Sequence, residues 1–290
     1  MNYQEMRERF MKLDMHCHVK EGSIDSKVSL DEYITKLKEE GFDGMLITDH
    51  DTYGGYRHWK NEMLGKVHQD FVVLKGIEYD TSDAGHIICI MPEGVKMRLL
   101  ELRGLPVSVL IDFVHRHGGI LGPAHPCGEK YQSYTNAARF YKSPEVIKRF
   151  DFFEAFNPCE SVESNAGAAK LCEKYKKPGL GGSDSHRIEC VGKAYTLLPQ
   201  RVTGETELIE LIRNKADIRC GGTYYGKTLK QKMGPTSKIL TYGFWVYNKS
   251  GEMLKRRKRK LKGELENPVD PIDPIEIPYL SNIKERRGWM

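Results

Sequence analysis

The chain reads Leu46-Ile47-Thr48-Asp49-His50-Asp51 at residues 46–51, where an apolar run passes directly into an acid, an imidazole and a second acid. A short, continuous apolar run is typical of a strand that is buried on both faces. Such a strand would hold the acidic and imidazole side chains at its carboxyl end. The same layout recurs along the chain, which indicates a sheet whose strands end at a common polar edge.

Short apolar runs alternate with segments of helical period. Ser29 and Glu32 are typical of a capping box, and Gly41 would end that helix. Apolar stripes with helical spacing also cover 109–114 and 205–215. Alternating strands and helices predict an α/β fold with a parallel sheet, either open or closed into a barrel. The predicted strands are Met11–Met15, Met45–Thr48, Phe71–Gly76, His86–Met91, Ile120–Pro123, Phe152–Phe156, Gly179–Gly182 and Ala194–Leu198.

Composition excludes several classes of protein. The 290 residues suffice for one large domain or for a barrel with a small appendage. No apolar run approaches the roughly 18 residues of a membrane span, so we expect no membrane partner. The N-terminal sequence lacks the apolar core of a secretory signal, and the seven cysteines form no CxxC pair. We therefore expect reduced thiols and a cytoplasmic protein.

The positive charge is concentrated at the C-terminus. Residues 223–290 hold 15 Lys+Arg against 7 Asp+Glu, although the net charge of the whole chain is +5. Residues 255–262 form a nearly continuous basic run, and a Pro/Asp-rich stretch follows it. We predict a main domain over 1–222 and a basic, partly extended tail over 223–290. Basic runs are usually solvated, but this one could also contact nucleic acid.

Two histidines two residues apart follow the first predicted strand, in Leu13-Asp14-Met15-His16-Cys17-His18. Residues at this spacing on a strand point to the same side, so His16 and His18 should converge. Imidazoles in such a pair suit zinc, manganese or iron. The pair is a weak signal alone, because HxH also occurs by chance.

Four more clusters of imidazole and carboxylate lie at predicted strand ends. They are Asp49-His50-Asp51, Glu78 with His86, His125, and Asp184-Ser185-His186. Active sites of α/β sheets and barrels gather at the carboxyl ends of the strands. Side chains from five or six strands would then meet in one pocket, which predicts a metal-dependent hydrolase.

The clusters together resemble the motifs of the polymerase and histidinol phosphatase (PHP) superfamily of metal-dependent phosphoesterases. The corresponding runs are Asp14–His18, Thr48–Asp51, Gly76–Glu78, Ala124–Pro126 and Gly182–His186. They occur in the family's order over about residues 13–220. The resemblance implies a distorted (β/α)7 TIM-like barrel, here with a basic C-terminal extension, that holds two or three divalent metal ions.

The resemblance also implies a set of ligands for each metal ion. The first set is His16, His18, Glu78 and Asp184. The second set is His50, His186 and an acid that follows the HxH pair. The third set is His86 and His125, with Glu78 as a bridge.

This chain departs from the family pattern in two places. Relatives often have an acid five residues after the second histidine, where this chain has Ser23. Asp25 or Glu21 would replace it. Asp25 is preferred because it lies four residues before the helix cap Ser29, as the family's acid does before its own helix cap. Only 38 residues separate His86 from His125, so the long insert that covers the site in some nucleotide-cleaving relatives is not expected.

The reaction implied by the resemblance is hydrolysis of a phosphate mono- or diester in a nucleotide, an oligonucleotide or a small phosphorylated metabolite. A metal-activated water would attack phosphorus. Asp49, His58 or the non-ligand acid of the Glu21/Asp25 pair would assist the leaving group. Lys20, Lys130 and Arg187 would hold phosphate, although solvation alone would also explain each of these three side chains.

Two other functions fit parts of the sequence. A metal-dependent amidohydrolase also opens with HxH, but such enzymes commonly bridge their metals with a strand lysine, where this chain offers Glu78. An inactive, nucleic-acid-binding accessory protein would explain the basic run. Metal content distinguishes an active hydrolase from such an accessory protein. Degenerate barrels lose ligands, whereas this chain has a candidate at every ligand position.

Overall fold

The computed structural model describes residues 10–95, 98–128 and 132–225. Lys130 and most of the predicted tail, including the basic run at 255–262, lie outside the described residues. No helix in the described ranges is long and apolar enough to span a bilayer.

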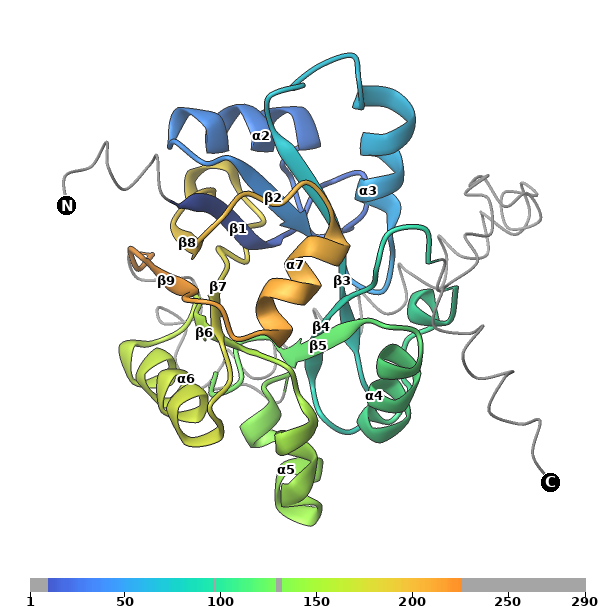
Figure 1. The fold of residues 1–290 in the computed structure, drawn as a ribbon, viewed down its shortest axis with the longest axis vertical. Coiled ribbons are helices and arrows are strands. Elements are labelled where there is room, and N and C mark those ends of the chain that lie inside the picture. Colours follow the sequence, from blue (N-terminus) through green and yellow to red (C-terminus); the bar gives the residue numbers. More distant parts are fainter. Residues whose placement is uncertain (1–9, 96–97, 129–131, 226–290) are drawn as a thin grey trace.

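In the part of the chain that the structure describes, nine strands form two sheets, which Figure 1 shows. The larger sheet is curled and has the order β5-β4-β3-β2-β1-β8-β9, and β6 and β7 form the smaller one. All eight predicted strands are confirmed to within a few residues, and β9 was not predicted. The strands are β1 Met11–Cys17, β2 Gly44–Ile47, β3 Val72–Asp80, β4 His86–Ile90, β5 Ile120–Pro123, β6 Phe153–Phe156, β7 Gly179–Gly181, β8 Ala194–Leu198 and β9 Arg219–Gly222.

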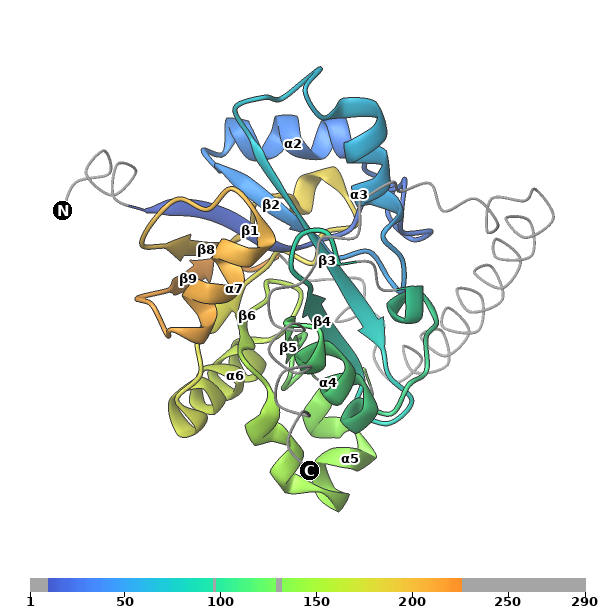
Figure 2. The same cartoon turned by 45° about the vertical axis from the view of Figure 1, so that its right-hand side comes forward.

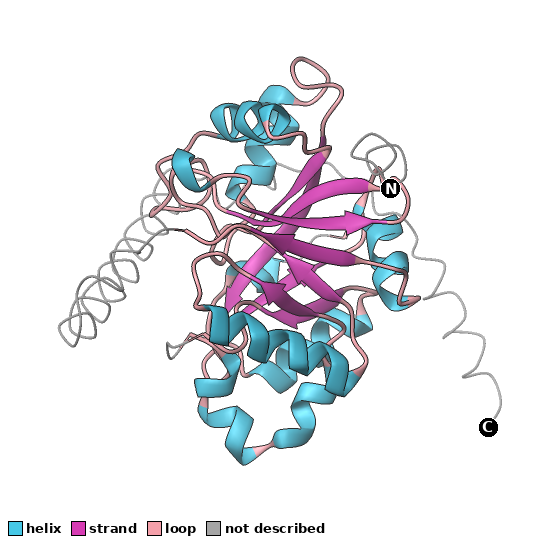
Figure 3. Ribbon diagram, turned by 90° about the vertical axis from the view of Figure 1, so that its left-hand side faces the viewer, coloured by secondary structure: helices cyan, strands magenta, loops and turns pink. Residues whose placement is uncertain are grey.

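Helices surround the strands, with α2 and α3 over one part of the sheet and α4, α5 and α6 at the other end of the molecule (Figures 2 and 3). The predicted capping box of Ser29 and Glu32 is present at the start of α2. The α-helices are α2 Leu30–Glu39, α3 Gly54–His58, α4 Val107–Arg116, α5 Ala138–Lys142, α6 Val162–Tyr175 and α7 Glu205–Arg213. The shorter turns are a π-helix η1 Trp59–Met63 and the 3-10 segments η2 Arg98–Glu101, η3 Tyr134–Asn136, η4 Pro144–Arg149 and η5 Ile188–Cys190.

The prediction of a parallel sheet is wrong for much of the larger sheet. β1, β2 and β3 are parallel, but β4 is antiparallel to both β3 and β5, and β8 is antiparallel to both β1 and β9. Residues 81–85 alone join β3 to β4, which is too short for a parallel crossover. The hairpin pairs Asp80 with His86, so the first residue of β4 lies at the same edge as the end of β3.

The smaller sheet spans the open side of the larger one. The Asp151 amide, just before β6, donates to Leu121 O of β5 at 2.9 Å. The Gly181 amide of β7 donates to Thr196 Oγ1 of β8 at 2.8 Å, and Ser185 bridges to Cys17 of β1. The strands therefore form a curled α/β arrangement that is consistent with the expected distorted barrel.

An irregularity in β1 changes which side chains face the barrel interior. Leu13 and Met15 pack with Leu208 of α7 in the core inside the barrel, whereas Cys17 and Val19 pack in the core under α2. The register between β1 and β2 shifts between Asp14 and Cys17, as at a β-bulge. A bulge re-aims the side chains that follow it. His16 and His18 consequently face the inside, above the apolar core.

Gly122 of β5 marks a close approach between backbones. A Cβ at this position would lie 2.3 Å from Phe152 O and 2.6 Å from a carbon of the Phe152 ring. We expect Gly122→Ala to lower the free energy of unfolding by about 1–3 kcal/mol, because the backbone of residue 152 must move. Urea denaturation measures the change.

The matched control is Gly167→Ala in α6. Its Cβ would lie 3.2 Å from the Cys127 sulfur, which is a side chain that can adjust, and alanine favours a helix over glycine. We expect this variant to stay within about 1 kcal/mol of the wild type. An equal loss in both variants would show that the approach at Gly122 is not tight.

Candidate metal centre

Six histidines and three acids meet at one end of the barrel. His16 lies in β1 and His18 directly follows it, His50 follows β2, and Glu78 lies in β3. The remaining members are Asp25 in the β1–α2 connection, His86 at the start of β4, His125 after β5, and Asp184 and His186 after β7. The sequence predicted this whole set, and the structure brings all nine side chains together.

Glu78 lies at the centre of the cluster. Its Oε1 is 2.9 Å from His86 Nδ1 and 3.3 Å from His125 Nε2. Its Oε2 is 2.9 Å from His50 Nδ1 and 3.4 Å from both His16 Nε2 and His18 Nε2. The two carboxylate oxygens thus face two different groups of imidazoles, which is the arrangement expected of a bridging ligand.

Asp184 completes the group around His16 and His18. Its Oδ1 lies 3.7 Å from His16 Nε2 and 3.3 Å from His18 Nε2. The Asp14 carboxylate accepts hydrogen bonds from the Ser183 amide and hydroxyl at 2.8 and 2.6 Å. Asp14 therefore fastens the loop that carries Asp184 to β1.

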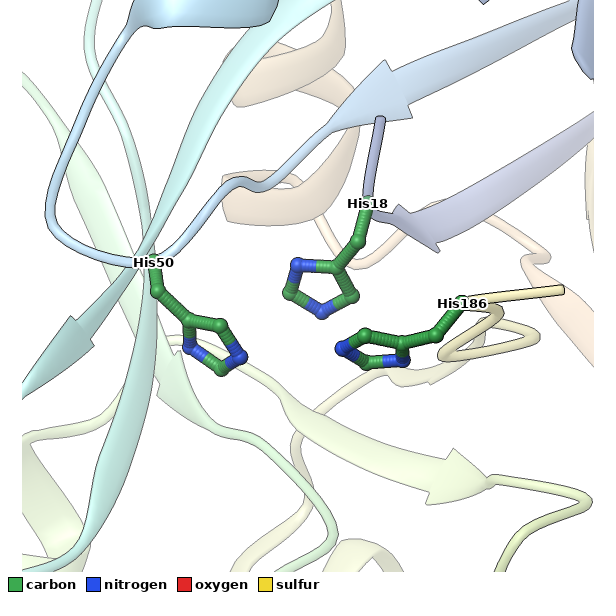
Figure 4. Close-up of side chains that lie close together, drawn as sticks. All are labelled: His18, His50 and His186. Atoms are coloured by element: carbon green, nitrogen blue, oxygen red, sulfur yellow. The ribbon is translucent and has the colours of Figure 1, made fainter. Parts of the chain in front are cut away.

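The structure places Asp25, and not Glu21, beside the cluster. Asp25 Oδ2 lies 3.5 Å from His50 Nε2 and 3.4 Å from His186 Nε2. Glu21 instead accepts a hydrogen bond from the Leu30 amide at the start of α2. Figure 4 shows His18, His50 and His186 converging from three separate segments.

The donor set fits divalent metal ions. His16 Nε2 and His18 Nε2 lie 3.0 Å apart, so two imidazole nitrogens face one point. Glu78 Oε2 and Asp25 Oδ1 are buried and accept no hydrogen bond from the described residues. Buried carboxylate oxygens are normally paired or bound to a metal. Three groups have ligand atoms close enough for one ion: His18, His50 and His186; His16, His18 and Asp184; and His50, Glu78 and His86.

The cluster combines an ionised acid with imidazoles in different charge states. Burial would raise the pKa of Glu78, but the rings of His86, His16 and His50 hold it well below its usual range. Burial, with the neighbouring His186 and His50, lowers the pKa of His18 to about 3. For four other rings burial lowers the pKa, but the neighbouring carboxylates raise it above its usual range: His16, His50, His125 and His186. Because ionised carboxylates and neutral imidazoles are the forms that coordinate metals, these rings would release protons when an ion binds.

Burial divides the cluster into a deep side and an open side. The side chains of His16, His18 and Glu78 are 0–1% exposed, whereas those of His50 and His186 are 28% and 29% exposed. Among the described residues, the cluster is therefore open to solvent on the side of His50 and His186.

Asp49 and His58, which were expected to assist catalysis, are not among the nine side chains of the cluster. Asp49 is fully buried, and its carboxylate accepts hydrogen bonds from the Val19 and Gly55 amides and the Ser23 hydroxyl at 2.9–3.0 Å. Burial raises the pKa of Asp49 to about 7, and these contacts favour a structural role. His58 is half-buried at the end of α3 and forms no ion pair with the described acids of the cluster.

Two of the three basic residues expected to hold phosphate are described, and both are exposed. Lys20 follows His18 by two residues, and Arg187 comes directly after His186. The Arg187 side chain is 52% exposed and lies 4.0 Å from Glu189. Both residues are close to a candidate ligand in sequence, and both side chains are exposed to solvent.

Sequence patterns did not single out Glu154, which is 1% exposed in β6 and contacts His16. Its signal was an acid inside the apolar run Phe152-Phe153-Glu154-Ala155-Phe156. The sequence also did not predict a contact of Ser23 with the cluster, but its hydroxyl lies 3.2 Å from His18 Nδ1.

Fold and site together place the chain among the metal-dependent hydrolases. The chain belongs to the PHP family: the model of the PHP domain matches residues 14–176, and a PHP-associated model matches residues 162–216. The resemblance inferred from the sequence motifs is confirmed. Comparison with curated proteins gave no match.

Solved structures share the fold at low sequence identity. PsfC from Pseudomonas syringae is 14% identical with a TM-score of 0.51, covering 83% of this chain and 99% of its own. A candidate metal-dependent phosphoesterase from Bifidobacterium adolescentis is 14% identical with a TM-score of 0.50, covering 69% and 96%. The lesion-specific endonuclease Q from Pyrococcus furiosus is 15% identical with a TM-score of 0.52, covering 73% of this chain and 57% of that longer protein.

We expect divalent metal ions to stabilise the fold, because they would bind the folded cluster and not the unfolded chain. A ligand at 100 times its dissociation constant adds about 2.7 kcal/mol to the free energy of unfolding. Thermal melts of chelator-treated protein, with manganese, zinc and iron added back separately, measure the shift. Glu78→Gln should respond much less than the wild type. A similar rise in Tm for both proteins would contradict a centre built on Glu78.

Proposed function

We propose that the chain is a metal-dependent phosphoesterase that binds two or three divalent ions, with manganese, zinc or iron as candidates. The observation that carries the proposal is Glu78, whose two oxygens face separate groups of imidazoles at 2.9–3.4 Å. His16, His18 and Asp184 would hold the first ion with Glu78. The second ion would be held by Asp25, His50 and His186, and the third by His86, His125 and Glu78.

The contacts of the strand lysines weigh against an amidohydrolase. Two lysines occur in the described strands, Lys12 of β1 and Lys75 of β3. The Lys12 ammonium lies over the Phe42 ring, and Lys75 Nζ is 3.4 Å from Val95 O. Both contacts lie outside the cluster, in which Glu78 would be the bridging ligand.

The residues on the open side define how a substrate would bind. A phosphate ester would enter beside His50 and His186, and Lys20 and Arg187 would hold its oxygens by charge. Bound divalent ions would supply a water that is acidic enough to ionise near neutral pH, and would offset the charge on the phosphoryl oxygens. His58 is a better candidate than Asp49 to protonate the leaving group, because the described donors already occupy both Asp49 oxygens.

A substrate panel tests the reaction. We expect release of phosphate, or cleavage of a diester, when manganese, zinc or iron is added separately to chelator-treated protein. Glu78→Gln should lose at least about 100-fold in kcat/KM with its fold retained, because a bridging ligand is removed. Turnover of amides without turnover of phosphate esters would overturn the proposal in favour of an amidohydrolase.

Oligonucleotides are the favoured substrates among phosphate esters. The Tyr225 hydroxyl donates to Ser183 O and Cys190 O, and its amide donates to Pro158 O at 3.2 Å. The described chain thus ends next to the loop that carries Asp184, and the basic run at 255–262 follows 30 residues later. The structural similarity to an endonuclease agrees with this substrate class.

We expect deletion of residues 251–290 to weaken activity on long oligonucleotides and to spare small phosphate esters. The basic run would add contacts to phosphate backbones, whose strength falls with salt concentration. Measuring KM for both substrate lengths at two salt concentrations checks this. Equal loss on both substrates, with an unchanged circular dichroism spectrum, would remove the tail from substrate binding. A full-length protein without bound metal would instead favour the accessory nucleic-acid-binding role.

A further inference from the structure

Glu154 is a buried acid that the expected ligand sets do not include. It lies in β6, where Phe153 packs into the apolar core and Glu154 faces the metal centre. A carboxylate that is 1% exposed is unfavourable unless its oxygens are paired. Its contacts therefore define what it does.

Both oxygens of Glu154 are engaged by other parts of the centre. Oε1 lies 2.8 Å from His16 Nδ1. Oε2 accepts hydrogen bonds from the His125 amide at 2.5 Å and from Asn157 Nδ2 at 3.1 Å. Glu154 thus contacts two candidate ligands, His16 and His125, and both of its oxygens are paired with protein groups.

The contact with His16 fixes which nitrogen of that ring is available. A carboxylate at Nδ1 favours the form in which Nδ1 carries the proton. The other nitrogen, Nε2, then presents its lone pair toward Glu78, His18 and Asp184, which lie 3.0–3.7 Å away.

Asn157 extends the same support to Asp184. Its Nδ2 donates to Asp184 Oδ2 at 3.2 Å as well as to Glu154. Asn157 is itself held by Asn165 of α6, which accepts from the Asn157 amide at 2.8 Å and donates to its carbonyl at 2.9 Å. The backbone of Asn157 is therefore held by the 14-residue helix α6.

We propose that Glu154 and Asn157 are positioning residues that set the first and third metal sites together. They hold the ring of His16, the backbone at His125 and the carboxylate of Asp184, and they leave the ligands His50, His186 and Asp25 of the second site untouched. The proposal rests on the metal centre proposed above. It adds that two of the three sites share one support from β6.

The test compares Glu154→Gln with the wild type and with Glu145→Gln. Glu145 is a matched control because its side chain is 76% exposed and pairs with Lys148 on the surface. Metal content after dialysis and competition with a coloured chelator, using manganese and zinc alone, give stoichiometry and affinity. Thermal melts in chelator give the stability of the metal-free protein.

For Glu154→Gln we expect metal affinity to fall by about 10–100-fold at the first and third sites, and one class of site to keep its affinity. The amide cannot accept hydrogen bonds at both ends as the carboxylate does. Asn157→Ala should show a smaller loss, because it removes the contact with Asp184 and leaves that between Glu154 and His16. Glu145→Gln should match the wild type.

Three results would overturn the proposal. Unchanged stoichiometry and affinity in Glu154→Gln would show that the residue supports no metal site. A lower Tm of the metal-free protein with unchanged metal affinity would assign Glu154 a structural role. An equal loss of metal affinity at all sites would show that the first and third sites do not share a separate support. Because no substrate is used, metal binding that depends on Glu154 would stand even if the panel of phosphate esters showed no turnover.

Discussion

The structure depends on keeping one ionised carboxylate, Glu78, inside a barrel. Five imidazoles approach its two oxygens, and the charge of His86, His16 and His50 holds the pKa of Glu78 far below the value that burial alone would give. Removing a single partner from a buried ionic cluster leaves another charge unpaired, which is strongly unfavourable. The strands that deliver these side chains must therefore meet at one level. The bulge in β1, the hairpin at 81–85 and the anchoring of Ser183 by Asp14 all serve that requirement.

Much of the fold could be predicted from the sequence, because buried strands are short apolar runs with distinct ends. The direction of β4 could not, since apolar composition carries no information about parallel or antiparallel pairing. The short connection 81–85 was the available signal, and it forbids a crossover. β9 escaped prediction because Arg219-Cys220-Gly221-Gly222 contains two glycines and is only partly buried.

Most ligand candidates could be found because they lie near the end or the start of a strand, and the family motifs then sorted them into sets. The choice between Asp25 and Glu21 needed the path of a loop, which spacing does not determine. Glu154 lies within a strand whose other residues are apolar, so only its burial and its contact with His16 distinguish it from an acid at a strand edge. Asp49 shows the converse, because an acid next to a candidate ligand can be directed wholly into the protein.

The β3–β4 hairpin has a consequence for how the centre assembles during folding. Glu78 and His86 are eight residues apart in the chain, and their contact forms when one hairpin closes. His16 and Asp184 are separated by 168 residues, so their contact requires the first strand to meet the segment after β7. Contacts between near neighbours in sequence form faster than contacts between distant segments. Glu78 thus acquires its first imidazole early, and the centre is completed only when the first strand meets the segment after β7.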